Sequence, residues 1–240
     1  MKKFLFSVCA VLAILGCGGE NVDELPLLMP GRSDYDGGGG YTGSYGSVSY
    51  GGKTYKTVQI GTQTWFAENF NYDPGTGNSA CYDNLASNCA TYGRLYDWST
   101  AMSLSSDCNS NLCANQIQSK HRGICPSGWH IPTQAEWNTL SSYVLQSNSG
   151  CICDAELLKA TSGWNSNGNG TDQYGFSALP GGFGFSGGNF DDAGYNGTWW
   201  SASEDNSDYA YLRTMDYDFE LAYGYYFDKS DLYSVRCIKD

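Results

Sequence analysis

The cysteines constrain the fold of this chain more than any other residue type. There are ten of them, and the N-terminus MKKFLFSVCAVLAILGC places two lysines before an apolar run from Phe4 to Leu15. That run is too short to span a bilayer and is typical of a secretory signal peptide. Exported chains meet oxidising conditions, where an even number of cysteines favours disulfides over metal or redox chemistry. We therefore expect residues 1–16 to be removed and the remaining cysteines to brace the fold.

Cys17 is the predicted site of lipidation. Residues 14–17, Ile-Leu-Gly-Cys, resemble the bacterial lipobox, in which the cysteine is acylated and becomes the first mature residue. Several acyl chains suffice for stable membrane anchoring. Glycine at position 18, where aspartate would favour retention, indicates an outer-membrane lipoprotein exposed at the cell surface. The alternative is ordinary cleavage nearby, with Cys17 left free.

Eight cysteines then remain in the body of the chain, and they allow 105 pairings. The spacings of Cys108/Cys113 and Cys151/Cys153 are similar to those of metal ligands, but the second pair is separated by one residue, and no histidine accompanies them. We expect no metal site there.

The charge balance limits the partners. Removal of the signal peptide leaves 11 basic against 25 acidic residues, a formal net charge of −14. Nucleic acids and anionic lipids bind to clusters of lysine and arginine, so neither is expected as a partner. The charge is compatible with cations, neutral glycans or simple solubility.

The composition divides the mature chain into two parts. Residues 17–47 are rich in glycine and serine without apolar periodicity, which predicts a flexible tether. Residues 48–240 have the size of one domain. In it, KTYKTVQIGTQTWF predicts a hairpin with its turn at Gly61 and Thr62.

Two helices are predicted. Leu95, Trp98 and Met102 have the spacing of one helix face. Thr133 and Glu136 form a capping-box pattern, which satisfies unpaired backbone N–H groups at a helix start. An apolar stripe follows at Trp137, Leu140 and Val144. The capping pattern gives Glu136 a structural task.

Several motifs occur in an order that carries a resemblance: GKTYKTVQIGTQTWFAENF, CYDN, YGRLYDW, CPSGWHIPTQAEW, YGFSALPGG, WWSASE and SVRCIKD. This series resembles the Fibrobacter succinogenes major paralogous domain from about residue 48 to the end. More distantly, IPTQAEW and the VRC ending are similar to the formylglycine-generating sulfatase-modifying family, whose fold is C-type-lectin-like.

The resemblance implies an α+β, C-type-lectin-like domain with a small twisted antiparallel sheet, two helices, long loops and stabilising disulfides. Its terminal strands would meet, so residues 55–60 would pair near 233–238. It also suggests a disulfide between Cys125 and Cys237, and Cys81 is expected to close a local loop with Cys89. The other four cysteines could pair locally, as Cys108–Cys113 and Cys151–Cys153, or across the two clusters.

No catalytic residue is predicted. The sulfatase-modifying relatives use paired cysteines and copper, but the corresponding stretch here, from Trp199 to Val235, contains no cysteine. Cys125, His130 and Glu136 imitate a nucleophile, base and acid, yet an oxidised cysteine is no thiolate. A glycosidase-type carboxylate pair remains open, because nothing singles out two of the 25 acids.

Residues 161–203 form an irregular stretch rich in glycine and aromatic residues. Trp164, Tyr174 and Trp199 are the predicted ligand-binding residues there, because aromatic faces stack on sugars and polypeptides. The alternative is that these rings fill the core beneath long loops, as we expect for Trp200.

Calcium is the possible cofactor. The EPN, QPD and WND motifs of sugar-binding C-type lectins are absent. A group of oxygen-bearing residues could still supply ligands, although a solvated acidic loop is the expected alternative: Asp205, Asn206, Asp208, Asp216 and Asp218.

These observations predict a lipid-anchored, non-catalytic binding or adhesion module for extracellular polysaccharide or protein. The alternatives are a structural surface protein without a specific ligand and a formylglycine-generating-like enzyme.

Overall fold

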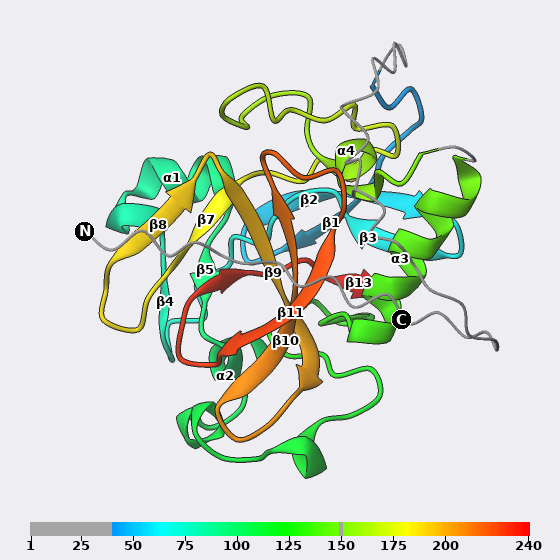
Figure 1. Cartoon of the computed structure of the whole chain (residues 1–240). Coiled ribbons are helices and arrows are strands. Elements are labelled where there is room, and N and C mark those ends of the chain that lie inside the picture. Colours follow the sequence, from blue (N-terminus) through cyan, green and yellow to red (C-terminus); the bar gives the residue numbers. More distant parts are fainter. Residues whose placement is uncertain (1–39, 149–150) are drawn as a thin grey trace, which may run out of the picture. The chain divides into compact units, whose positions relative to one another are not determined.

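A computed structural model describes residues 40–148 and 151–240 of the chain. In this part, two mainly antiparallel sheets are joined by long loops and a few short helices (Figure 1). The predicted α+β class with antiparallel sheet and disulfides is therefore confirmed, but the described residues form two sheets and four α-helices where one small sheet and two helices were predicted. The signal peptide, Cys17 and the tether up to residue 39 lie outside the described residues.

The first sheet has five strands in the order β1-β2-β3-β13-β6. The strands are β1 (Gly46–Tyr50), β2 (Lys53–Ile60), β3 (Gln63–Phe66), β13 (Ile238–Lys239) and β6 (Trp129–His130). Ile60 faces Gln63 across the β2–β3 turn, where Gly61 has a φ of +57°, a conformation that side chains with a Cβ rarely adopt. The predicted hairpin is confirmed.

The C-terminal segment meets the N-terminal hairpin one strand away from its predicted position. It lies beside β3 and the residues that follow, with Phe66 N donating to Cys237 O (2.9 Å) and Phe70 N donating to Val235 O (2.8 Å). Strand β2 instead pairs with β1 along residues 53–57 and with β3 along residues 57–60. Strand β1 also begins inside the predicted tether, and Tyr41 N donates to Asp172 O (3.0 Å).

The second sheet follows the path β11-β10-β9-β12-β5-β4, and a β7–β8 hairpin joins it through β9. Most pairs are antiparallel, but β9 pairs in parallel with β7 and β12. The strands are β4 (Ser79–Ala80), β5 (Leu95–Tyr96), β7 (Gly181–Gly184), β8 (Phe190–Ala193), β9 (Asn196–Glu204), β10 (Tyr209–Asp216), β11 (Tyr223–Asp228) and β12 (Tyr233–Ser234).

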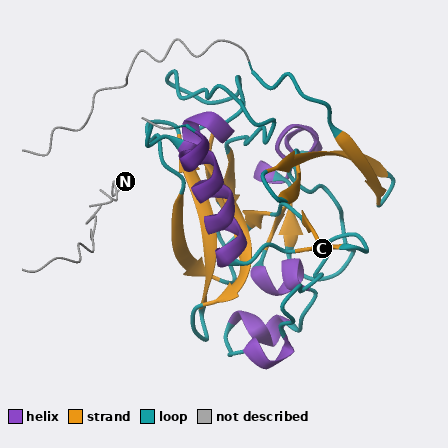
Figure 2. Ribbon diagram, turned by 90° about the vertical axis from the view of Figure 1, so that its right-hand side faces the viewer, coloured by secondary structure: helices purple, strands orange, loops and turns teal. Residues whose placement is uncertain are grey.

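The helices are short apart from α3, which lies across β9 and β10 (Figure 2). They are α1 (Ala86–Tyr92), α2 (Trp98–Met102), α3 (Gln134–Ser147) and α4 (Asp154–Leu158), with 3-10 turns at Tyr82–Asn84, Ser106–Asn109 and Ala114–Gln116. None of the helices within the described ranges has the length and apolar character of a membrane span.

The capping box of α3 is confirmed: Thr133 Oγ1 accepts from Glu136 N (3.2 Å), and the Glu136 carboxylate accepts from Thr133 N (2.8 Å). The other predicted helix begins later than the spacing indicated. Leu95 belongs to β5, and α2 starts at Trp98 because the Asp97 carboxylate caps it by accepting from Thr100 N (2.7 Å).

Strand β9 separates two hydrophobic cores. Successive side chains of a strand point to opposite faces, so Trp199 and Trp200 enter different cores. Trp200 packs with Tyr96 and Trp98, and its indole N–H donates to Tyr96 O (2.7 Å). Trp199 packs with Trp137, and its N–H donates to Asn69 Oδ1 (2.8 Å). Each buried indole thus keeps a hydrogen-bond partner.

Four disulfides connect the eight body cysteines. The two suggested pairs form, Cys125–Cys237 and Cys81–Cys89. The four remaining cysteines pair within their own clusters, as Cys108–Cys113 and Cys151–Cys153.

Candidate functional site

The structure corrects the predicted aromatic platform. Trp199 has no exposed surface and Trp164 is 4% exposed, with its indole N–H donating to Ala178 O (3.0 Å). Tyr174 is half-buried, and its hydroxyl oxygen accepts a hydrogen bond from Asn148 Nδ2 (2.6 Å). The two tryptophans fill the core under the glycine-rich loops, so they offer no face to an external ligand. Trp200 is buried as expected.

Exposed aromatic side chains gather instead on the β10–β11 hairpin at the edge of the second sheet. Tyr209 is 40% exposed and Tyr226 is 53% exposed, and the half-buried Tyr211 packs against Tyr226. We call these three residues the tyrosine face. Contiguous exposed aromatic surface of this kind marks binding sites, since a monomeric protein gains little from leaving it in water.

Strand register explains why the three rings share one side of the hairpin. Tyr211 is directly opposite Tyr226, and Tyr209 is its diagonal neighbour two residues away on β10. Their ring centroids lie 6.0 Å and 5.9 Å from that of Tyr226, with interplanar angles of 82° and 56°. The rings therefore form a faceted cluster and not a flat plane.

Polar groups from the β9–β10 turn border the tyrosine face. Asn206 Oδ1 accepts from Asp208 N (2.9 Å) and Tyr209 N (3.0 Å), which fixes the turn. A hydrogen bond to the Asp205 carboxylate, together with the charge of that group, raises the pKa of the Tyr211 phenol. Carboxylate, amide and phenol groups thus stand beside exposed ring surface, which is the combination that binds a ligand with both apolar faces and hydroxyl groups.

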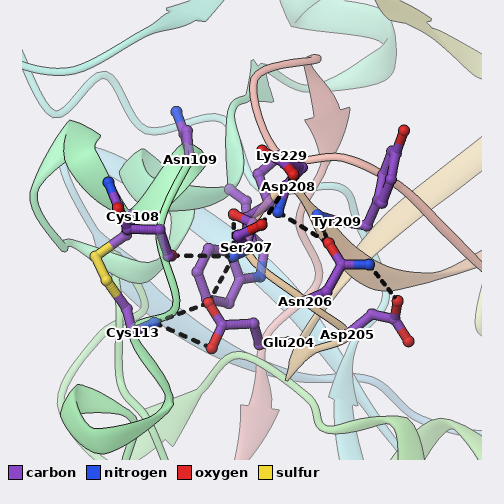
Figure 3. A network of polar contacts seen from close by, with 12 residues as sticks. Cys108, Asn109, Cys113, Glu204, Asp205, Asn206, Ser207, Asp208, Tyr209 and Lys229 are labelled. Atoms are coloured by element: carbon purple, nitrogen blue, oxygen red, sulfur yellow. Dashed lines mark hydrogen bonds and ion pairs between the residues drawn. A yellow bond between two sulfur atoms is a disulfide. The ribbon is translucent and has the colours of Figure 1, made fainter.

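A buried ion pair holds this turn in place (Figure 3). Lys229, which follows β11, is fully buried and pairs through Nζ with Glu204 Oε1 (2.5 Å) at the end of β9. Nζ also donates to Ser207 O (3.0 Å) and lies 4.8 Å from the centre of the Trp98 ring. Glu204 accepts from Cys113 N with both carboxylate oxygens (3.0 and 3.1 Å). The turn is thereby fixed to the loop that the Cys108–Cys113 disulfide closes.

The five oxygen-bearing residues proposed as calcium ligands do not form one site. Asp205, Asn206 and Asp208 lie in the β9–β10 turn, whereas Asp216 is the last residue of β10 and Asp218 follows it. Asp208 and Asp216 are eight positions apart along an extended strand, a distance of about 25 Å. Burial, and then the Asp218 carboxylate, raise the pKa of Asp216 to about 6. Within the described residues, no group of three or more His, Cys, Asp or Glu side chains could hold a metal ion.

The other candidate constellation, Cys125, His130 and Glu136, is divided between two structural tasks. Cys125 is in a disulfide. The buried His130 ring lies between two carboxylates, with Nε2 2.8 Å from Glu136 Oε1 and Nδ1 2.8 Å from Asp240 Oδ1. This clamp joins the start of α3 to the last residue of the chain.

The clamp should make stability depend on pH. Burial disfavours the charged His130 ring, but hydrogen bonds to Glu136 and Asp240 outweigh it and raise the pKa of His130 above 6.5. Burial likewise opposes charge on Glu136, yet hydrogen bonds from His130 and Thr133 lower the pKa of Glu136 below 4.5. The contribution of His130 to the free energy of unfolding is therefore complete below pH 6.5, and it is lost as the pH rises through the pKa of His130 in the folded state. The glutamate contribution is present above pH 4.5 and lost as pH falls through its folded-state pKa.

We expect His130→Asn to lower the free energy of unfolding by about 1 kcal/mol near pH 5.5, because charge-assisted bonds are lost while the half-exposed Asp240 is partly screened by solvent. The loss should shrink above neutral pH. Urea titrations from pH 4 to 9 measure it. His121→Asn is the matched control, because that ring bonds the Met102 carbonyl (2.7 Å) instead of carboxylates. Equal pH profiles for the two variants would contradict the clamp.

The tyrosine face was not predicted from the sequence, although its residues lie in two tyrosine-rich stretches. YAY at 209–211 alternates large and small residues with the period of a strand, and YGYY at 223–226 is a second tyrosine-rich stretch close by. Each stretch alone shows which residues share a strand face, but not whether that face is exposed or buried. The cluster exists because the register of β10 and β11 places these tyrosines opposite one another.

Comparison with known proteins identifies one family. The model of the Fibrobacter succinogenes major domain matches residues 58–239. No curated protein and no solved structure matches the chain.

Proposed function

Since the chain belongs to the Fibrobacter succinogenes major domain family, and since its exposed tyrosine face lies on a braced hairpin, we propose that it is a non-catalytic binding module for extracellular polysaccharide. A lipid on Cys17 would anchor it to the outer membrane, with the domain outside the cell. The tyrosine face is the observation that carries this proposal.

Carbohydrate suits this surface better than a flat apolar partner. A sugar ring has an apolar face of C–H groups, which packs on tyrosine, and a rim of hydroxyl groups. Asp205 and Asn206 provide acceptors and a donor for such hydroxyls next to the rings. The interplanar angles of 56° and 82° allow a flat crystalline surface to contact only one ring fully, whereas an individual chain can follow the facets.

The frame supports a binding role because it is rigid where the ligand would dock. The Glu204–Lys229 pair and the Cys108–Cys113 disulfide lie directly behind the turn. We also propose a C-type-lectin-like arrangement. The return of β13 to the N-terminal hairpin, locked by Cys125–Cys237, supports it.

A catalytic role is disfavoured by the state of the thiols. All eight cysteines of the described domain are in disulfides, so chemistry of the formylglycine-generating kind would have no thiolate. A protein ligand on the same tyrosine face, or a structural role without a ligand, are the alternative outcomes of the test.

The test is a glycan-array screen of the oxidised protein, followed by titration with the best soluble glycan. We expect the double change Tyr209→Ala and Tyr226→Ala to weaken binding about 10-fold or more, since each stacking contact contributes about 1 kcal/mol. The control is Tyr143→Ala with Tyr195→Ala, two rings of similar exposure (42% and 43%) outside the tyrosine face.

Three outcomes separate the alternatives. Equal weakening in both double variants would remove the tyrosine face from the proposal. Binding to proteins but to no glycan would favour a protein partner. Tighter binding to crystalline cellulose than to soluble cello-oligosaccharides would contradict the preference for individual chains.

A further inference from the structure

A small polar pocket lies away from the tyrosine face, beside the β1–β2 hairpin. Its volume is about 170 Å³. Its lining includes Tyr45, Lys53, Lys56, Glu68, Asn69 and Thr91. This size accommodates one small functional group with a few attached atoms.

Helix α1 forms one wall of the pocket, contributing Ala90 and Thr91. The Cys81–Cys89 disulfide fixes this helix, and Asn71 Nδ2 donates to Cys89 O (2.9 Å). The short disulfide loop thus positions a wall of the pocket in addition to bracing its own segment.

Positive charge is concentrated at this pocket although the protein as a whole is acidic, with a net charge of −12. Lys53 and Lys56 both line it. The Lys56 ammonium lies 5.3 Å from the centre of the Tyr45 ring. Such a contact leaves its N–H groups able to bind an anion, because an aromatic face accepts no strong hydrogen bond.

A third cation lies directly behind the pocket. Arg236 is fully buried, and it donates through Nε to Asn69 Oδ1 (2.9 Å) and through Nη2 to Ser177 O (2.8 Å). Asn69 and Ser177 both line the pocket. Burial lowers the pKa of Arg236 to about 9, so the guanidinium stays charged at neutral pH. Its hydrogen-bond partners are neutral oxygens and not carboxylates.

Two carboxylates offset these three cations only in part. Glu68 accepts from Lys56 N (2.6 Å) and lies 3.8 Å from Lys53 Nζ. Asp172 is bound to Ser177 N (2.7 Å), and burial raises the pKa of Asp172. With both acids ionised, the balance around the pocket is still one positive charge, which matches a single anionic group.

We propose that this pocket binds the carboxylate of a small acidic molecule. Lys56 pairs with the carboxylate, and Tyr45 and Thr91 contact the atoms attached to it. The same group occurs in acidic sugars and in free organic acids, so the test includes both. The proposal does not depend on the tyrosine face.

Isothermal titration calorimetry of the oxidised protein with glucuronate, lactate and glucose tests the assignment. We expect glucuronate to bind more tightly than glucose, and added salt to weaken it. Lys56→Met should weaken binding about 5- to 10-fold, whereas Lys120→Met, at an exposed lysine elsewhere, should leave it unchanged. Both lysines are exposed, so neither change should unfold the protein.

Selective binding of glucuronate would show that the bound carboxylate comes from an acidic sugar. Equal binding of lactate would show that it comes from a free organic acid. Either result supports the carboxylate site. Equal affinity for glucuronate and glucose, no binding of either acid, or an unchanged Lys56→Met variant would overturn it. The Tyr209→Ala and Tyr226→Ala variant should still bind glucuronate, which separates failure of this pocket from failure of the tyrosine face.

Discussion

Changing both Cys125 and Cys237 to alanine is expected to lower the free energy of unfolding by about 4–5 kcal/mol. The disulfide spans 112 residues, and closing so long a loop removes much entropy from the unfolded chain. Both side chains are fully buried, so the truncation adds a small packing loss. A loss of this size is a large fraction of the stability of an ordinary domain. Urea unfolding under oxidising conditions measures it.

The Cys81–Cys89 pair is the matched control for that experiment. It spans only eight residues, so the same model gives about 2.5 kcal/mol for its removal. We expect the two double variants to differ by about 2 kcal/mol. If both lose the same stability, or if the long-range variant is as stable as the parent, loop closure is not what Cys125–Cys237 contributes.

Lys229→Met should have the second largest effect, a loss of about 3–5 kcal/mol, because it leaves the Glu204 carboxylate buried without its cation. Glu204 has 4% of its side chain exposed, too little for water to replace Lys229. Urea unfolding measures the loss, and Lys120→Met, on the exposed surface, should cost less than about 0.5 kcal/mol.

A second variant separates the unpaired charge from simple loss of packing. Glu204→Gln combined with Lys229→Met removes both charges, and the amide oxygen can still accept from Cys113 N. We therefore expect the double variant to regain about 2 kcal/mol relative to Lys229→Met alone. A double variant that is less stable than the single one would show that the buried charge is not the main cost. Because the pair supports the β9–β10 turn, Lys229→Met should also weaken any ligand bound at the tyrosine face.

The local predictions succeeded where a few neighbouring residues decide the structure. The capping box at Thr133 and Glu136 and the turn at Gly61 depend on backbone groups within three or four residues. The helix predicted from Leu95 failed at its start because the spacing could not show that Asp97 ends strand β5 and caps α2 at Trp98. An apolar spacing shows which residues share a face but does not show which of them begins the helix.

The candidate site was harder to predict, since burial depends on what covers a residue. Trp164 and Trp199 occur among glycines and asparagines, as loop aromatics on a surface often do, yet the structure places them under those loops. Tyr209 and Tyr226 are ordinary strand residues by their pattern, and they are exposed because this face of the β10–β11 hairpin is left uncovered at their positions. Sequence alone does not tell which face of a sheet is covered.

By itself, the sequence determined the α+β class, the family and two of the four disulfides. The reason is that ordered motifs along the chain carry the family resemblance, which implied the class and those disulfides. Only the tertiary structure decided which aromatic rings face water, that Lys229 meets Glu204, and that Lys53, Lys56 and Arg236 surround one pocket. These arrangements join residues 25 to more than 160 positions apart. No local pattern records such distances, because they follow from how the strands are ordered in the two sheets.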